Sequence, residues 1–200
     1  MNFGDIVVTI SYRSICVFCS SSDAVAPVYF DAARELGRLM ASQRLTLVYG
    51  GGNVGLMGAL ARSVHDGGSK VIGVIPSALR DLELAYTEAD EMIVTKDLRE
   101  RKAIMESYAD AFVALPGGYG TVEEIIEVLT LKQLRFHDKP LVFLNTAGFY
   151  AHLRAFFEYL YEHHFAKPIS RGLYRFVDEP QDVLDVLERW EPTPAGTKWF

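Results

Sequence analysis

Residues 115–124 read Leu-Pro-Gly-Gly-Tyr-Gly-Thr-Val-Glu-Glu and follow an apolar run that begins at Ala111. The change from an apolar run to helical periodicity predicts a strand, a glycine turn and a helix that begins near Thr121. Three glycines allow close approach of the backbone to a ligand, and the first amides of a helix are unpaired and partly positive. The turn therefore predicts an anion site, usually for phosphate. The acids that follow within one helical turn suggest chemistry on a nucleotide or a sugar phosphate.

Apolar runs alternate with amphipathic segments along the rest of the chain. Strands with few polar residues, separated by helices, predict an α/β fold with a parallel sheet covered on both faces. We find no internal repeat and no linker, so we expect a single domain. The expected strands are 15–19, 46–49, 70–75, 91–94, 111–115, 141–144 and 174–177, and the expected helices are 27–42, 54–66, 98–108, 121–136, 149–163 and 181–190.

Length and composition restrict the function. The chain has 200 residues, of which 50% are apolar, and a formal net charge of −6. This charge argues against DNA or RNA as the main partner, whereas a small anion can still be bound locally. No apolar run reaches the roughly 18–20 residues of a membrane span. The first 13 residues lack a signal-peptide pattern, so we expect a cytoplasmic protein without a membrane partner.

The two cysteines, Cys16 and Cys19, form a C-x-x-C motif within an expected strand. Side chains three residues apart on a strand point to opposite faces, which does not suit a shared metal or a redox pair. We therefore interpret them as core cysteines. The five histidines lack the spacing of metal ligands, and we predict no metal site and no cofactor.

Three polar or glycine-rich turns follow expected strands: residues 20–23, 50–53 and 117–121. The carboxyl ends of parallel strands share one edge of the sheet, so these turns should converge there. Residues 50–55 also satisfy G-x-G-x-x-G, but the next strand ends Val-Ile-Pro-Ser at 74–77, without the acid that holds the ribose of NAD. A phosphate or base near this loop is therefore favoured over NAD.

Thr121 and Glu124 have a second interpretation. The pattern Thr-x-x-Glu at a helix start is a capping box, in which the two side chains satisfy exposed backbone amides. A capping box needs no catalysis, although it does not explain the glycines before it. From the residues alone, both interpretations stay open. The basic cluster at 99–102 is likewise either a solvated first helical turn or a source of an arginine for a phosphate or a carboxylate.

The combination of motifs resembles the LONELY GUY family. Residues 116–124 match the family signature P-G-G-x-G-T-x-x-E, and Arg101-Lys102 match its Arg-Lys pair. The similarity extends over nearly the whole chain and includes residues 16–22, 49–52, 65–68 and 137–140. It implies a Rossmann-like nucleotide-binding catalytic domain, expected at residues 13–190. From the residues themselves we expect a flexible N-terminus at 1–12 and an irregular tail at 191–200, which contains Pro192, Pro194 and Gly196. The resemblance also implies a homodimer or larger oligomer.

The same resemblance implies hydrolysis of cytokinin riboside 5′-monophosphates, and of AMP, to the free base and ribose 5-phosphate. Arg101 and Glu124 would form the catalytic pair. The implied nucleotide-binding residues are Glu83, Lys102, Gly117, Gly118, Tyr119, Gly120, Thr121, Val122 and Glu123, and we add Ser20, Gly51 and Gly52 from the neighbouring turns.

Two departures from the family pattern are Ser20-Ser21, where many members have Gly-Ser, and Leu98-Arg99-Glu100 before the Arg-Lys pair. The alternative function is a non-catalytic carrier of a phosphorylated ligand, similar to molybdenum-cofactor carrier proteins. A carrier has no need of an acid beside its anion site, so the Glu123-Glu124 pair favours the enzyme.

Overall fold

The computed structural model describes residues 12–80, 82 and 85–192, and within them a seven-stranded parallel sheet. The order of the strands is β4-β3-β2-β1-β5-β6-β7. The chain builds outward from β1 to β4, returns to the other side of β1, and continues outward to β7. The strands are β1 Ser14–Phe18, β2 Thr46–Tyr49, β3 Val71–Pro76, β4 Glu91–Thr95, β5 Ala111–Ala114, β6 Leu141–Leu144 and β7 Arg175–Val177.

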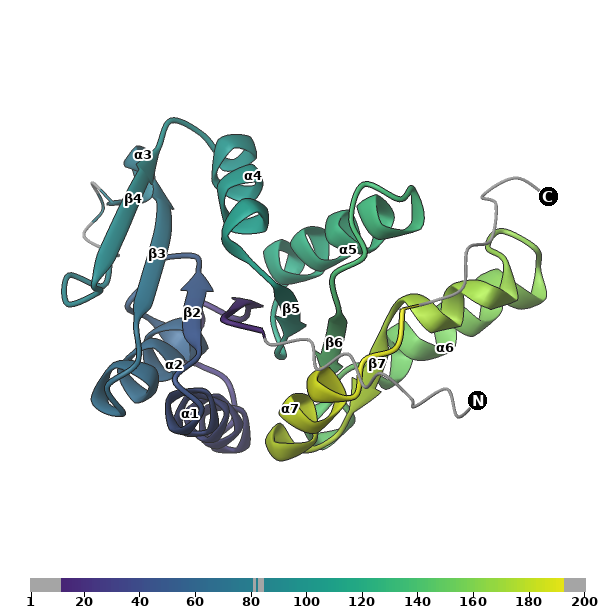
Figure 1. Cartoon of the computed structure of the whole chain (residues 1–200), viewed down its shortest axis with the longest axis horizontal. Helices are drawn as coiled ribbons and strands as arrows, with labels where there is room; N and C mark the ends of the chain where they lie inside the picture. Colours follow the sequence, from purple (N-terminus) through teal and green to yellow (C-terminus); the bar gives the residue numbers. More distant parts are fainter. Residues whose placement is uncertain (1–11, 81, 83–84, 193–200) are drawn as a thin grey trace, which may run out of the picture.

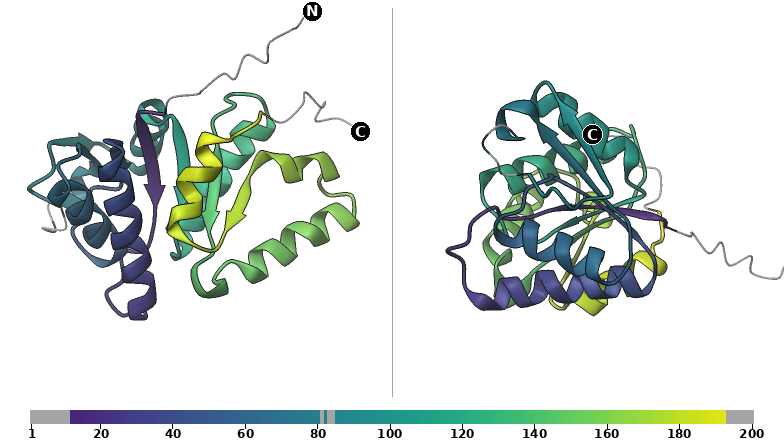
Figure 2. Two further views of the ribbon diagram at one scale, coloured as in Figure 1. Left: turned by 60° about the horizontal axis from the view of Figure 1, so that its bottom comes forward. Right: turned by 90° about the vertical axis from the view of Figure 1, so that its left-hand side faces the viewer.

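The helices form a layer on each face of the sheet. In Figure 1, α1, α2 and α7 lie along the lower side of the sheet, with α4 and α5 above it, and Figure 2 shows the same arrangement from two further sides. The α-helices are α1 Pro27–Ser42, α2 Gly55–Asp66, α3 Ser77–Arg80, α4 Leu98–Tyr108, α5 Tyr119–Gln133, α6 Ala151–Glu162 and α7 Pro180–Glu188, and the 3-10 helices are η1 Thr146–Gly148 and η2 Pro168–Leu173.

Two apolar cores result from the alternation of strand side chains. Val17 and Val113 pack with α1, α2 and α7 on one face, and Phe112 and Ala114 pack with α4, α5 and α6 on the other. Cys16 and Cys19 are free and belong to opposite cores. This confirms the interpretation of the C-x-x-C motif as a core feature, because strand geometry separates the two thiols.

The predicted α/β architecture is confirmed, and all seven expected strands are present with ends shifted by at most one residue. The expected helix 121–136 is wrong at both ends, because α5 begins at Tyr119 and ends at Gln133. The short helix α3 and both 3-10 helices were not predicted, since such short segments carry no periodic signal. Residues 1–11 and 193–200 lie outside the described part of the chain, so the proposed domain limits at both termini stay predictions.

Among the described residues, no helix is both long and apolar enough to cross a membrane.

Candidate nucleotide site

The site lies where the chain changes direction across the sheet. Strands β1 and β5 are neighbours, but the connections that leave their carboxyl ends run to opposite sides. Such a switch point leaves a crevice that binds ligands in open parallel sheets. Here the turns after the two strands are tied together, because the Ser20 amide donates a hydrogen bond of 3.2 Å to the Pro116 carbonyl.

Helix α5 starts at this crevice with its first turn open. Its N-cap is Gly118, and among the described residues no side chain accepts a hydrogen bond from the amides of this first turn. A Cβ added to Gly118 or Gly120 would meet nothing within 4 Å, and the Tyr119 side chain is 98% exposed. The amides of the first helical turn have no partner within a helix. They are therefore available to an anion.

The capping-box interpretation of Thr121 and Glu124 is wrong. Thr121 is the third residue of α5 and not its N-cap, and its side chain lies back over Gly117, where an added Cβ would be 2.1 Å from Thr121 Oγ1. The Glu124 carboxylate contacts Arg101 of α4 instead of reaching back to its own helix start. The missing Cβ of Gly117 thus gives Thr121 room to pack, which explains one glycine of the motif.

Two other helix starts at the same edge already have acceptors for their amides. The Ser20 carbonyl accepts hydrogen bonds from the amides of Leu56 and Met57 at the start of α2. Asp23 accepts from the Gly55 amide of the same helix at 2.9 Å. At α4, the Asp97 carboxylate accepts from two amides at 2.8 and 2.9 Å. Of the three helices, α5 is the one with an open N-terminus.

Arg101 and Glu124 form an ion pair between α4 and α5, with side chains only 11% and 10% exposed. The Arg101 Nε also donates to the Val74 carbonyl at 2.9 Å, so the guanidinium is held from two sides. Burial raises the pKa of the Glu124 carboxyl above its usual range, and the guanidinium of Arg101 opposes that rise. A buried and oriented carboxylate of this kind is typical of a functional site.

Gly50 makes room for this ion pair. A Cβ added at Gly50 would lie 2.1 Å from Arg101 Nη2. Gly51 and Gly52 lie deeper: the Gly51 carbonyl accepts from the Tyr86 amide at 2.9 Å, and Gly52 bridges Ala85. The sequence analysis identified the glycine run but missed the role of Gly50, because its contact with Arg101 joins residues 51 positions apart.

Lys102, next to Arg101, points along the outside of α5. Its Nζ forms ion pairs with Glu123 and Glu127, on successive turns of the helix. Burial lowers the pKa of Lys102, but the two carboxylates outweigh this effect and raise it. Lys102 is therefore a fully charged cation, and both of its carboxylate partners belong to α5.

The structure brings most of the predicted residues together at this crevice. Three of the predicted residues are not exposed at it: the Val122 side chain is half-buried and its amide donates to the Gly118 carbonyl, and Gly51 and Gly52 are buried. Glu83 lies outside the described residues. The roles of all the predicted binding residues stay predictions.

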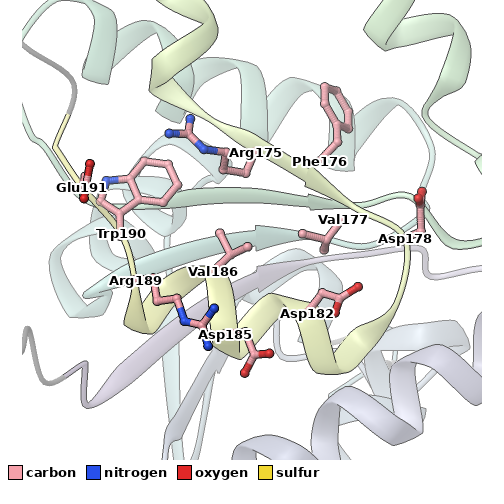
Figure 3. A pocket seen from close by; sticks show the side chains of 10 residues that line it. All are labelled: Arg175, Phe176, Val177, Asp178, Asp182, Asp185, Val186, Arg189, Trp190 and Glu191. Carbon is pink, nitrogen blue, oxygen red and sulfur yellow. The ribbon is translucent and has the colours of Figure 1, made fainter.

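A separate pocket lies between β7 and α7, at an edge of the sheet (Figure 3). Its volume is about 520 Å³, and it shares no residue with the crevice. Four carboxylates and two guanidinium groups line it, a balance that does not favour a phosphate. The charged lining residues are Arg175, Asp178, Asp182, Asp185, Arg189 and Glu191.

In the described part of the chain, no group of three or more His, Cys, Asp or Glu residues is placed to hold a metal.

The fold and the crevice define a class: single-domain, Rossmann-like α/β proteins with an open helix N-terminus and a buried arginine–glutamate pair at the switch point of the sheet.

Residues 57–187 match the family model described as possible lysine decarboxylase. The chain is 44% identical over 181 residues to the cytokinin riboside 5′-monophosphate phosphoribohydrolase LOG3 of Arabidopsis thaliana, covering 90% of this chain and 84% of that protein. A second relative is the probable cytokinin riboside 5′-monophosphate phosphoribohydrolase LOGL2 of Oryza sativa, 43% identical over 93% of this chain and 76% of that protein. The chain belongs to the LONELY GUY family.

Solved structures share the fold. The molybdenum cofactor carrier protein of Chlamydomonas reinhardtii superposes with a TM-score of 0.71 over 90% of this chain and 98% of that one. Its sequence identity is 24%, so the likeness extends to the fold alone.

Proposed function

We propose that the protein hydrolyses the N-glycosidic bond of cytokinin riboside 5′-monophosphates, and of AMP, to the free base and ribose 5-phosphate. The observation that carries the proposal is the buried Arg101–Glu124 pair beside the open start of α5. The names of relatives that are 40–44% identical over most of the chain support it.

The geometry suits a nucleoside 5′-monophosphate. The amides of residues 118–121 would hold the phosphate, and Lys102 would add positive charge close by. Glu124 lies five residues beyond Tyr119, the first residue of α5, or roughly 7.5 Å along the helix axis at 1.5 Å per residue. This spacing is on the scale of the sugar that separates a 5′-phosphate from its glycosidic carbon. Anchoring the phosphate would therefore present the glycosidic bond to the carboxylate.

The reaction then requires charge stabilisation at the sugar. Cleavage of an N-glycosidic bond develops positive charge on the ribose ring, as in an oxocarbenium ion, which a fixed carboxylate stabilises. Glu124 would supply the negative charge that offsets it and would contact the ribose or the attacking water. The C–N bond breaks as the water oxygen bonds to the glycosidic carbon, and the proton that the water loses balances the proton that the departing base gains. Arg101, held by the Val74 carbonyl, would orient the carboxylate. No metal or cofactor is needed for this step.

The remaining predicted residues would shape the binding site. Gly117 to Glu123 would form the phosphate turn, with Tyr119 free to contact the substrate from its exposed position. Ser20, Gly51, Gly52 and Glu83 would border the nucleotide from the neighbouring turns.

We also propose a homodimer that works in the cytoplasm. Four large apolar side chains on α6 and the segment after it are exposed, which is typical of an interface. They are Phe156, Tyr159, Phe165 and Ile169, with exposed fractions between 47% and 77%. Light scattering coupled to gel filtration tests the dimer, and a monomer at micromolar concentration would contradict it.

The activity is tested by incubating the protein with AMP and with prenylated AMP and separating the products by chromatography. Free base and ribose 5-phosphate in equal amounts are expected. The corresponding nucleosides, which lack the phosphate, should react far more slowly, because the α5 amides would have no anion to hold. If the protein binds AMP but releases no base, the alternative of a ligand carrier is favoured instead.

A further inference from the structure

Tyr150, at the start of α6, contacts the backbone immediately before the phosphate turn. Its hydroxyl donates a hydrogen bond of 2.6 Å to the Leu115 carbonyl, and the side chain is 2% exposed. Leu115 is followed by Pro116 and the glycines of the turn. The contact joins two segments 35 residues apart and lies wholly inside the protein.

The Leu115 carbonyl has lost its partner in the sheet. The Leu115 amide donates to the Phe18 carbonyl of β1 at 2.9 Å, so continuation of the β1–β5 ladder would pair the Leu115 carbonyl with the Ser20 amide. That amide donates instead to the Pro116 carbonyl, at 3.2 Å. A buried carbonyl without a donor is destabilising. The Tyr150 hydroxyl supplies the missing donor.

Tyr150 is itself held rigidly. Its amide donates to Asn145 Oδ1 at 2.7 Å, and Asn145 Nδ2 in turn donates to Asp178 at 2.8 Å. The ring makes edge contacts with Phe143 and Phe149, with centroid distances of 5.3 and 4.9 Å. Burial raises the pKa of the Tyr150 hydroxyl well above its usual range, so the group remains a donor at neutral pH.

The peptide that Tyr150 holds determines where the phosphate turn begins. The Ser20 amide fixes the next carbonyl, that of Pro116, and the Leu115 amide donates to the Phe18 carbonyl at 2.9 Å. These two contacts reach the turn from the side of β1, whereas Tyr150 reaches it from the side of β6. Without Tyr150, the Leu115–Pro116 peptide can tilt toward another donor or water, and the amides of α5 tilt with it.

We propose that Tyr150 is a positioning residue of the phosphate site, which aims the first amides of α5 by holding the Leu115 carbonyl. The inference rests on the proposed function in that it assigns these amides to a phosphate. Tyr150 contacts no reacting atom, and its effect should appear in phosphate binding more than in the chemical step.

The test is the variant Tyr150→Phe, which keeps the ring and removes the hydroxyl. We expect its Kd for ribose 5-phosphate, measured by calorimetry, to rise about tenfold, because the α5 amides are no longer held in line with the phosphate. With AMP, KM should rise by a similar factor while kcat changes by less than about threefold, because weaker ground-state binding raises KM selectively. The pH profile should be unchanged.

The matched control is Tyr161→Phe. Tyr161 is also buried, belongs to the same apolar core, and loses a hydrogen bond of 2.8 Å to the Tyr174 hydroxyl. Both variants should lose similar thermal stability, but only Tyr150→Phe should lose affinity for the phosphate.

Unchanged affinity in Tyr150→Phe, or an equal loss in both variants, overturns the inference. A wild-type protein that binds ribose 5-phosphate but releases no base contradicts the proposed function alone, since the binding comparison still decides the role of Tyr150. A wild-type protein that does not bind ribose 5-phosphate overturns both.

Discussion

Replacing Gly50 with alanine should disable the Arg101–Glu124 pair while leaving the fold intact. The added Cβ would lie 2.1 Å from Arg101 Nη2, whereas unbonded heavy atoms prefer about 3.5 Å or more. The guanidinium would therefore have to move by more than about 1 Å. Gly50 is not in the left-handed region of φ, so alanine introduces no backbone strain there.

The Arg101 side chain cannot move away from Gly50 without losing one of its contacts. Moving away from Gly50 breaks the hydrogen bond of 2.9 Å from its Nε to the Val74 carbonyl, the ion pair with Glu124, or both. A misplacement of 1 Å in a catalytic group can cost about 10²-fold in rate. We therefore expect kcat/KM for AMP to fall about 100-fold, equivalent to about 2.7 kcal/mol.

The assay is release of free base from AMP, followed by chromatography, together with thermal unfolding monitored by circular dichroism. The matched control is Gly37→Ala, whose Cβ would lie 2.7 Å from the Ser63 Cβ between α1 and α2, away from the crevice. This control should lose stability but keep its kcat/KM. Gly50→Ala should lose kcat/KM, and it should also lose stability, because the buried Glu124 carboxylate loses its partner.

A double-mutant cycle separates an effect through Arg101 from a general disturbance. If Gly50 acts through Arg101, adding Gly50→Ala to Arg101→Ala should cost little more, because coupled residues are not additive. Full activity of Gly50→Ala, or additive losses in the double variant, would refute the reasoning.

Three further predictions concern ionisable groups. Glu124→Gln should lower kcat by about 10²–10³-fold, the usual loss of a transition-state electrostatic contact, and near-normal release of base from AMP would exclude a catalytic role. Because burial raises the pKa of Glu124 and the ionised form is the active one, kcat/KM of the wild type should rise with pH through a midpoint above the ordinary 4.5 and then level off. A midpoint at or below 4.5 would contradict this. Burial lowers the pKa of Lys132 to about 8 from an unfolded value of 10.5, so the unfolded state binds the extra proton between these values. The free energy of unfolding should therefore rise from pH 8 to 10.5. Urea titrations should show this rise in the wild type and a smaller one in Lys132→Met.

The sequence by itself determined the architecture. Buried parallel strands such as β6 have short apolar sequences, and helices such as α1 and α4 have apolar residues at helical spacing. Both kinds of element were therefore predicted from local signals. The glycine turn also predicted the open start of α5, because the link between glycine, a helix start and unpaired amides is a local property of the backbone.

Only the tertiary structure decided how that turn is used. A local pattern offers Thr121 and Glu124 as a capping box, but α5 starts two residues earlier, and Glu124 instead meets Arg101, 23 positions away. The room that Gly50 leaves for Arg101 and the hydrogen bond from Tyr150 to Leu115 are likewise contacts between distant segments. Such contacts depend on which strands become neighbours, and no local pattern in a single sequence encodes that choice.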